Sequence, residues 1–445
     1  MNNDKVNIGF VSLGCDKNRV DTEYMISALK KEEKFVIVGD KTAADVIVIN
    51  TCGFIGDAKT ESIDTILEMA ELKKGRLKKL IVTGCFAERY GVELFKKIPE
   101  ADAITGVGAY DKIKEMILAT LEDKRVLNLE KNTYDFTERT VTTPFHYAYL
   151  RISDGCNNRC SYCAIPSIRG AYRSRTFESI EEELKRLRDG YDIKELILVA
   201  QDVTRYGIDL YKEYALLKLL DVIEKYGFEW VRLLYCYPEL VSDELIKAAS
   251  ERNNVCKYLD IPLQHVNDEV LKSMNRKNDG KYARRLIKRI REIDDNIAVR
   301  STFITGYPAE TEDAFFELCD FIEEYKLENA GFFAFSKEEG TSAAKMKDMH
   351  YKTKQRRLTI LRGIQASVTE KNNKKRIGQT DKVLYEGLDE EKGLLYGRNQ
   401  YNAPDIDCLV YLESETPLDI GRFYAVEITD TEGVFDLRGK VKFQS

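Results

Sequence analysis

The sequence predicts an α/β fold in three parts: an N-terminal doubly wound α/β domain, a central partial (β/α)6 barrel of the TIM type, and a C-terminal small antiparallel β-barrel. The first two parts are predicted because short segments rich in Val, Ile and Leu alternate with amphipathic helical stretches. The third is predicted because short β-type segments lie between Gly, Pro and Asp turns near the end of the chain. The length of 445 residues agrees with roughly three domains of about 150 residues.

The composition excludes several classes of protein. Hydrophobic residues make up 43% of the chain, enough to build cores, so the bulk of the chain is not disordered. The longest apolar runs, such as residues 46–49 and 196–200, are far shorter than the roughly 18 residues of a membrane helix. The first ten residues lack the pattern of a secretory signal. We therefore expect a cytoplasmic protein that spans no membrane, whose ten cysteines are buried, metal-binding or catalytic.

The first domain is predicted over residues 1–130, and three of its strands end in a cysteine. These strands and their cysteines are residues 7–15 (Cys15), 44–52 (Cys52) and 79–85 (Cys85). In an open α/β sheet a ligand binds beyond the carboxyl ends of the strands, so the three thiols could share one site there. The helix that follows each strand would stabilise a thiolate at its N-terminus. The alternative is three buried small side chains.

The central barrel is predicted over residues 142–375, after a polar connector around residues 131–144. Its strands are expected at residues 147–152, 195–200, 230–235, 257–262, 297–304 and 331–335. Six units are too few for a closed eight-stranded barrel, so we expect an open or partial one. The spacing of apolar residues predicts a helix after Ser179-x-x-Glu182, which has the sequence of a capping box. A long charged helix is predicted over residues 352–376.

The C-terminal domain is predicted over residues 376–445 and is acidic. Its strands are expected at residues 381–385, 393–397, 406–412 and 423–429. It contains fourteen Asp or Glu and eight Lys or Arg, a formal charge of -6 that equals the charge of the whole chain. A domain that binds RNA needs cations to displace the phosphate counterions, so nucleic acid is disfavoured as a direct substrate and a basic protein is favoured. An acidic surface that serves only solubility is the alternative.

The strongest local signal is a C-x3-C-x2-C motif formed by Cys156, Cys160 and Cys163, directly after the first barrel strand. Thiolates select zinc or iron–sulfur clusters, and a closed zinc site needs a fourth ligand that does not follow at the usual spacing. We therefore expect an iron–sulfur cluster with one open iron, against the alternative of three cysteines clustered by chance. The remaining cysteines fit no ligand spacing and are expected as buried small side chains: Cys236, Cys256, Cys319 and Cys408.

This motif, with Tyr162 before its last cysteine, resembles that of the radical S-adenosylmethionine (SAM) superfamily. The resemblance implies a [4Fe-4S] cluster on the three cysteines, whose open iron chelates SAM and whose electron cleaves it. In such barrels the active-site residues lie at the C-terminal ends of the strands. The predicted SAM contacts are Tyr162, Gln201, Asp202, Gln264, Arg300, Thr302 and Gly306. His265 is a further candidate, or else a structural loop histidine.

The three parts together resemble the methylthiotransferase family over nearly the whole chain, with a TRAM domain as the C-terminal β-barrel. The resemblance implies a second [4Fe-4S] cluster on Cys15, Cys52 and Cys85, carrying sulfur that is methylated and inserted into a C–H bond. It also implies two SAM molecules per turnover and a reductant such as flavodoxin or ferredoxin. Lys17, Asn18 and Asp21 are candidates for positioning this cluster or the target loop.

Two branches of the family differ in substrate, and the local sequence favours one of them. One branch modifies the β-carbon of an aspartate in small-subunit ribosomal protein twelve, and the other is the tRNA adenosine 2-methylthiotransferases. The segment SLGCDKNRVD, with Lys17 where the tRNA enzymes tend to have Met, is similar to the first branch. Asp16 and Ala309 depart from the usual pattern, but neither is a predicted ligand. We expect a basic ribosomal protein as partner, contacted partly by the acidic TRAM domain, with the tRNA activity as the alternative.

Overall fold

The computed structural model describes residues 5–108, 110–130 and 138–442, and its contacts divide the chain into two compact units. The first, which we call the cysteine unit, comprises Met1–Thr142, Asp154–Arg173 and Ser336–Ala344. The second, the barrel unit, comprises Thr143–Ser153, Ser174–Phe335 and Lys345–Ser445. Part of the predicted connector lies outside the described residues, and the three-domain boundaries stay predictions. None of the described helices is long and apolar enough to cross a membrane.

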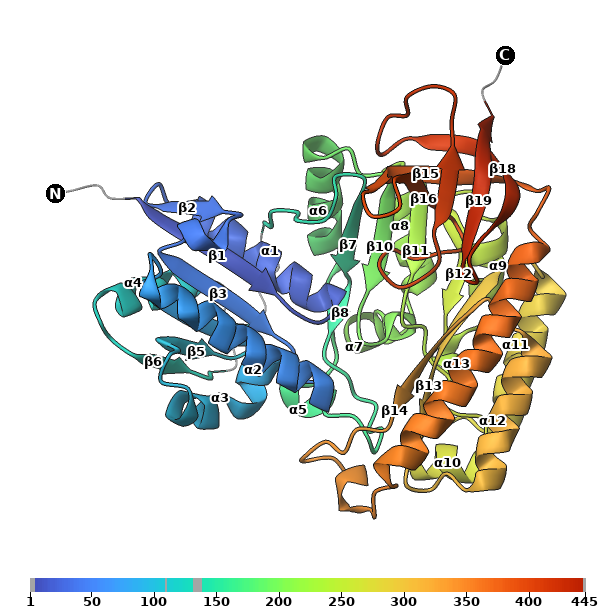
Figure 1. Cartoon of the computed structure of the whole chain (residues 1–445), viewed down its shortest axis with the longest axis horizontal. Coiled ribbons are helices and arrows are strands. Elements are labelled where there is room, and N and C mark those ends of the chain that lie inside the picture. The colour runs from blue at the N-terminus through green and yellow to red at the C-terminus, as the bar shows by residue number, and fades with distance from the viewer. Residues whose placement is uncertain (1–4, 109, 131–137, 443–445) are drawn as a thin grey trace. The chain divides into compact units, whose positions relative to one another are not determined.

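The cysteine unit contains a six-stranded parallel sheet in the order β2-β1-β3-β4-β5-β6 (Figure 1). Its strands are β1 (Val6–Ser12), β2 (Phe35–Val38), β3 (Val46–Thr51), β4 (Lys79–Gly84), β5 (Ala103–Thr105) and β6 (Val126–Asn128). Its helices are α1 (Asp16–Lys30), α2 (Gly56–Glu71), α3 (Cys85–Lys97), α4 (Ile113–Leu121) and α5 (Ile165–Arg169). The strand order reverses between β1 and β3, which is where a doubly wound sheet places its ligand.

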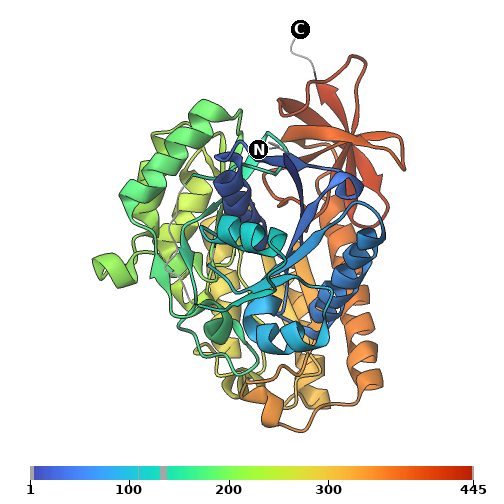
Figure 2. The same ribbon diagram turned by 90° about the vertical axis from the view of Figure 1, so that its left-hand side faces the viewer.

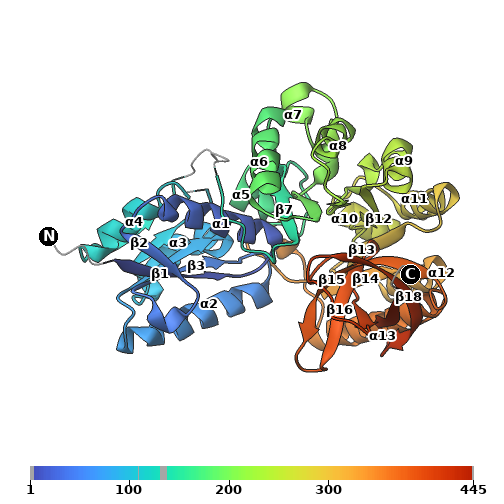
Figure 3. The same cartoon turned by 90° about the horizontal axis from the view of Figure 1, so that it is seen from above.

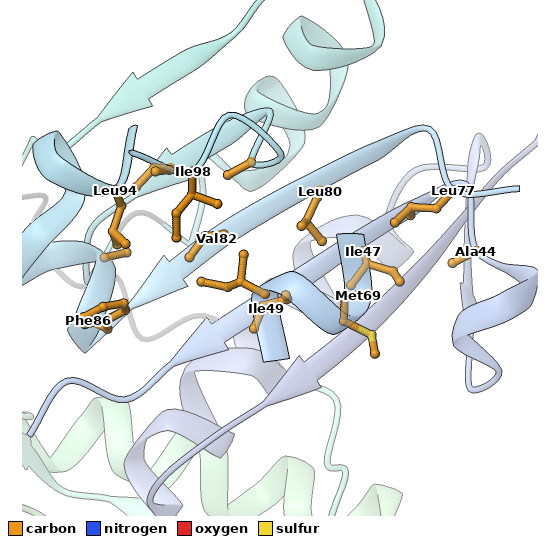
Figure 4. Packing of buried hydrophobic residues seen from close by; sticks show 14 residues of the cluster. Ala44, Ile47, Ile49, Met69, Leu77, Leu80, Val82, Phe86, Leu94 and Ile98 are labelled. Atoms are coloured by element: carbon orange, nitrogen blue, oxygen red, sulfur yellow. The ribbon is translucent and has the colours of Figure 1, made fainter. Parts of the chain in front are cut away.

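The core of this sheet explains why its strand ends are well defined. All six residues of β3 are buried, as expected of a strand with helices on both faces. Figure 4 shows Ile47, Ile49, Leu80 and Val82 of β3 and β4 in contact with residues of α2 and α3, among them Phe86. A close-packed apolar layer of this kind resists displacement of individual strands. The residues that follow β3 and β4 are therefore held in fixed positions.

The barrel unit contains a second six-stranded parallel sheet, in the order β14-β13-β12-β11-β10-β7, which confirms the predicted partial barrel. Helices lie on the outer side of this sheet (Figure 3). Its strands are β7 (Tyr147–Arg151), β10 (Glu195–Val199), β11 (Trp230–Leu233), β12 (Val255–Asp260), β13 (Ala298–Thr305) and β14 (Asn329–Ala334). Its helices are α6 (Phe177–Gly190), α7 (Ile208–Tyr211), α8 (Leu216–Glu224), α9 (Asp243–Glu251), α10 (Asp268–Ser273), α11 (Gly280–Ile293), α12 (Glu312–Tyr325) and α13 (Tyr351–Lys374). The short strands β8 (Ser153–Asp154) and β9 (Arg173–Ser174) lie near the cysteine loop in sequence.

The start of α6 corrects one prediction. The helix begins at Phe177, and its N-cap is Thr176, whose hydroxyl accepts a hydrogen bond from the Ser179 amide at 3.2 Å. Ser179 therefore lies inside the first turn and is not the cap. The ring of Phe177 stacks on Tyr211 with 4.8 Å between centroids. The helix thus begins earlier than the sequence predicted, at a residue whose contact with Tyr211 the local sequence does not reveal.

The C-terminal strands form a closed barrel in the order β15-β16-β17-β19-β18. Figure 2 shows these strands, in red, at one end of α13. They are β15 (Thr380–Asp389), β16 (Leu394–Asn399), β17 (Val410–Glu413), β18 (Phe423–Glu432) and β19 (Asp436–Lys442). The pairing of β17 with β19 is parallel, so the barrel is not purely antiparallel. Strand β19 was not predicted from the sequence, although Leu437, Gly439 and Val441 alternate with basic residues as in a strand with one buried face.

Candidate functional site

Three adjacent strands of the cysteine unit each lead into a cysteine. Cys15 follows β1 and forms the N-cap of α1, with an extended backbone conformation. Cys52 follows β3, and Cys85 is the first residue of α3 after β4. Because β1, β3 and β4 are neighbours and parallel, these residues lie at one edge of the sheet. We call them the distributed triad.

Close packing and electrostatics show that the distributed triad is clustered. A Cβ atom added at Gly14, which has a φ of +82°, would lie 2.9 Å from the Cys52 Sγ atom. Burial raises the pKa of Cys85 to about 12, and the nearby thiols of Cys15 and Cys52 also raise it. A thiol with so high a pKa stays neutral until a metal replaces its proton. The described residues contain no group of three placed for a single metal ion, whereas a four-iron cluster can bind each thiolate at a separate iron.

Asn18 connects the three turns of the distributed triad. Its side-chain amide donates hydrogen bonds to the carbonyl oxygens of Leu13 at 3.0 Å and Thr51 at 3.1 Å. Its Oδ1 atom lies 3.6 Å from the Cys85 Sγ atom. Asn18 is fully buried, so losing these hydrogen bonds would leave polar groups without solvent. These hydrogen bonds support the positioning role expected for Asn18, because they hold the backbone just before Cys15 and Cys52.

Cys156, Cys160 and Cys163, which we call the local triad, lie in one loop of the same unit. A Cβ atom at Gly155 would lie 2.2 Å from the Ala171 carbonyl oxygen, and Gly155 has a φ of +74°, so only glycine fits there. The Cys156 amide donates to the Gly170 carbonyl at 3.1 Å, which closes the base of the loop. All three cysteines are half-buried. This set of thiols fits an iron–sulfur cluster that keeps one position open to a ligand.

Helix α5 follows the local triad and packs on the distributed triad. Ala164 and Ile168 form one apolar cluster with Cys85 and Val107. Ala164 is the residue directly after Cys163, so a single short segment connects a cysteine of one triad with a cysteine of the other. The sequence predicted the two triads in separate domains. It had no signal for this contact, because Cys85 and Ala164 are distant in sequence.

A second connection between the triads was also missed. The segment Ser336–Ala344, which we call the strap, begins two residues after β14 and belongs to the cysteine unit. The carboxylate of Glu338 accepts hydrogen bonds from Lys59 at 2.9 Å and Arg89 at 2.6 Å, and Arg89 donates to the carbonyl of Gly53, the residue after Cys52. At its other end, the Ala343 amide donates to the carbonyl of Ser161 in the local triad's loop at 2.8 Å. The strap thus contacts loops of both triads.

Two of the predicted SAM contacts, Gln201 and Asp202, follow β10 but differ in their surroundings. Asp202 is fully buried and accepts hydrogen bonds from Thr204 at 2.6 Å and from Arg205, so it stabilises its own turn. Both polar atoms of the Gln201 side chain are buried without a hydrogen-bond partner. An unpaired buried amide is uncommon and calls for a bound group or water. Gln201 is therefore the more available of the two for a ligand.

The other predicted contacts lie on or after β12 and β13. Gln264 has a φ of +70°, and its backbone amide donates a hydrogen bond to the Thr302 carbonyl at 2.8 Å. Arg300 and Thr302 alternate along β13 with the buried Ser301 and Phe303, and Phe303 packs against α12. Arg300 and Thr302 therefore point to the opposite face of the sheet.

Four further candidate residues differ in their contacts. Arg300 forms ion pairs with Asp260 at 3.3 Å and with Asp407 of the C-terminal barrel at 3.2 Å. The Gly306 amide donates to Glu310 at 2.6 Å, and His265 lies 3.2 Å from the same carboxylate, as a structural loop histidine would. Tyr162 lies in the loop of the local triad, in the other unit. These SAM contacts stay predictions.

The C-terminal barrel contacts the N-terminal ends of the barrel unit's parallel strands. Glu195, the first residue of β10, is fully buried between Arg232 at 2.5 Å and Arg398 at 2.7 Å. Arg398 also pairs with Glu386, whose carboxylate lies 3.0 Å from His146. We call these five residues the buried ion network. It places the C-terminal barrel at the end of the sheet opposite the predicted SAM contacts that follow the strands.

The same contacts refine the charge of the C-terminal domain. Glu386 and Asp407 are buried in ion pairs, as is Asp381 with Arg376 at 2.5 Å, so none of them is available to a partner. An acidic surface remains. Its exposed members are Glu390, Glu391, Asp405, Glu413, Glu415, Asp419 and Asp430.

A parallel half-barrel together with a C-x3-C-x2-C loop defines a radical SAM enzyme, and residues 150–322 match the model of the Radical SAM superfamily. Residues 7–106 match a family described as "Uncharacterized protein family UPF0004", and residues 377–441 match the TRAM domain. The chain is 46% identical over 442 residues to "Ribosomal protein uS12 methylthiotransferase RimO" of Desulforamulus reducens, covering 98% of this chain and 99% of the relative. The protein of that name from Thermoanaerobacter sp. is 45% identical, with the same coverage. The chain belongs to the RimO family of methylthiotransferases.

A solved structure agrees on the fold. The cobalamin-dependent S-adenosylmethionine radical enzyme OxsB, with aqua-cobalamin and S-adenosylmethionine bound, superposes with a TM-score of 0.50 and 13% sequence identity. The match covers 81% of this chain and 56% of that chain. At this identity the likeness concerns the fold alone.

Proposed function

We propose that this chain inserts a methylthio group at the β-carbon of an aspartate of ribosomal protein uS12, by radical SAM chemistry with two [4Fe-4S] clusters. The observation that carries the proposal is that one compact unit holds two sets of three cysteines, joined by α5 and the strap. A single cluster would need only the local triad. A second set of thiols at three strand ends supports a second cluster that holds the sulfur to be transferred.

The chain's own residues divide the work between the two units. Cys156, Cys160 and Cys163 would hold the first cluster, which when bound supplies the open iron and the electron that SAM cleavage needs. Cys15, Cys52 and Cys85 would hold the second cluster, which supplies the transferred sulfur. The remaining roles fall to protein side chains at the strand ends. The unpaired amide of Gln201 would bind SAM, with Tyr162, Asp202, Gln264, Arg300, Thr302 and Gly306 as the other proposed contacts.

The substrate protein is proposed to contact two separate places. Its target aspartate must reach the chemistry at the C-terminal ends of the strands, whereas the acidic C-terminal barrel lies at their N-terminal ends. Strands of four to eight residues separate these ends by roughly 13 to 26 Å. The exposed acidic residues therefore bind basic regions of uS12 away from the modified aspartate, and they act on encounter and orientation.

The proposal is tested by supplying reconstituted protein with uS12, SAM and a reductant such as flavodoxin or ferredoxin. We expect uS12 to gain a methylthio group on an aspartate, detected by tandem mass spectrometry, and the protein to contain about eight irons per chain. Deletion of the gene should remove the same modification in cells. Loss of a methylthio group from tRNA, with uS12 unchanged, would overturn the proposal in favour of the tRNA adenosine activity.

A further inference from the structure

Arg169, the last residue of α5, donates hydrogen bonds toward both triads. Its Nη2 atom lies 2.7 Å from Asn18 Oδ1 and 2.8 Å from Asp21 Oδ2, both on α1 beside Cys15. Its Nη1 atom lies 3.4 Å from both carboxylate oxygens of Asp154, two residues before Cys156. The Arg169 side chain is 1% exposed. A buried guanidinium thus joins α1, the helix that follows Cys15, to β8, the short strand that precedes Cys156.

The partners of Arg169 are themselves connected to the cysteines. Asn18 holds the carbonyls of Leu13 and Thr51, which lie just before the turns of Cys15 and Cys52. On the other side, Arg169 is six residues after Cys163, and its helix packs on Cys85 through Ile168. A displacement of α5 therefore changes the position of the local triad relative to the distributed triad.

An arginine is suited to this place for two physical reasons. The guanidinium is planar and presents its donors in a fixed fork, so one side chain can bind acceptors on opposite sides in one geometry. Its positive charge also compensates the buried carboxylates of Asp21 and Asp154, with which it forms ion pairs at 2.8 Å and 3.4 Å. A lysine would preserve the charge but not the fork.

We propose that Arg169 is a positioning residue that fixes the distance between the two clusters by binding Asn18 and Asp21 on one side and Asp154 on the other. The inference rests on the proposed function, because it requires a cluster on each triad. Sulfur transfer needs the SAM-derived group and the sulfur donor in one geometry, and displacements of about 1 Å cost roughly a hundredfold in rate. Arg169 touches no reacting atom and acts only through this geometry.

The test compares Arg169→Lys and the double variant Arg169→Gln/Asp21→Asn with the wild type. The double variant removes the cation together with one of its carboxylates, so it leaves less uncompensated charge in the core. We expect both to retain about eight irons per chain and wild-type SAM cleavage. Pulsed electron paramagnetic resonance of the two reduced clusters should show a broadened distribution of distances between them. The yield of methylthio product per cleaved SAM should fall by roughly ten- to a hundredfold.

The matched control is Arg139→Gln. Arg139 forms a buried ion pair with Glu23, also on α1, but the bonds shown for it involve no cysteine turn. The control should lose stability and retain both the distance distribution and the product yield. An unchanged distance distribution and an unchanged yield in the Arg169 variants would overturn the inference. Loss of half the iron from these variants would also overturn it, because Arg169 would then be needed to bind a cluster and not to set the distance between the two clusters. Four irons in the wild type would instead contradict the proposed function.

Discussion

The two cysteine triads contain the same type of side chain but owe their geometry to different levels of structure. The local triad lies within eight residues of one loop, and its shape depends on Gly155 and on the hydrogen bond between Cys156 and Gly170. The distributed triad depends on the register of three parallel strands and on the side chain of Asn18. A loop motif can survive distortion of the sheet, whereas a site at three strand ends cannot. The two sites should therefore fail under different mutations.

The largest expected effect separates the triads by chemistry. Cys160→Ala removes a ligand of the local triad and should reduce SAM cleavage to background. Cys52→Ala should preserve SAM cleavage and abolish methylthio transfer, because this variant loses only the proposed sulfur-carrying cluster. Each variant should contain about four irons per chain. Cleavage products are measured by liquid chromatography, and retained methylthio transfer in both variants would contradict the assignment of the clusters.

A matched pair of glycine substitutions compares the two sources of geometry. Gly14→Ala and Gly155→Ala each place a methyl group at a positive φ and against a neighbour, at a cost of about 1 to 3 kcal/mol. Gly14→Ala should lower the iron bound by the distributed triad and leave SAM cleavage intact. Gly155→Ala should do the reverse. Iron content and cleavage are the measurements, and equal loss of both functions in both variants would show that the two sites do not fail independently.

A smaller effect is expected from Asn18→Ala. This change leaves the carbonyls of Leu13 and Thr51 without their partner, at a cost of about 1 to 3 kcal/mol. Iron should then be released to a chelator faster from the distributed triad only. Asn7→Ala is the control, since Asn7 also bonds a backbone carbonyl, that of Ala43, at the other end of the sheet. Equal release rates in the two variants would exclude a special role for Asn18.

A change in the buried ion network of the barrel unit is expected to leave the clusters unaffected. Burial raises the pKa of Glu386, but Arg398 and His146 lower it to a net value of about 2. The carboxylate therefore contributes stability above its ordinary pKa of 4.5, and this is lost as the pH falls from about 4.5 to about 2. The contribution is about 3 kcal/mol. Glu386→Gln should remove this acid-dependent part and leave the iron content at neutral pH unchanged.

The single tryptophan provides the measurement for this last prediction. Trp230 lies 4.6 Å from Phe423 of the C-terminal barrel, so its fluorescence reports the same interface. On acid titration, the tryptophan fluorescence of the wild type should change as the pH falls from about 4.5 to about 2. The fluorescence of Glu386→Gln should lack this change. A loss of iron at neutral pH in Glu386→Gln would show that the network reaches the cysteine unit, and would break the separation between the two triads and the barrel.

Much of the fold follows from the sequence because its signals are local. The apolar runs of β3 and β10 predict parallel strands, and the spacing of Cys156, Cys160 and Cys163 predicts a metal site. The position of Cys15, Cys52 and Cys85 after three strands predicts their proximity, since parallel strands end at one edge. Two of the missed features were local as well: the cap of α6 is Thr176, and β19 shows an alternation of apolar and basic residues that is typical of a strand.

The sequence by itself thus determined many of the elements, the family resemblance and the positions of both sets of cysteines. Only the tertiary structure decided that α5 and the strap join the two triads, that Arg169 and Asn18 lie between them, and that Glu386 and Asp407 of the acidic domain are buried in ion pairs. The physical reason is separation along the chain. Periodicity records which face of an element is buried, but a contact such as that between Glu195 and Arg398, 203 residues apart, leaves no local pattern.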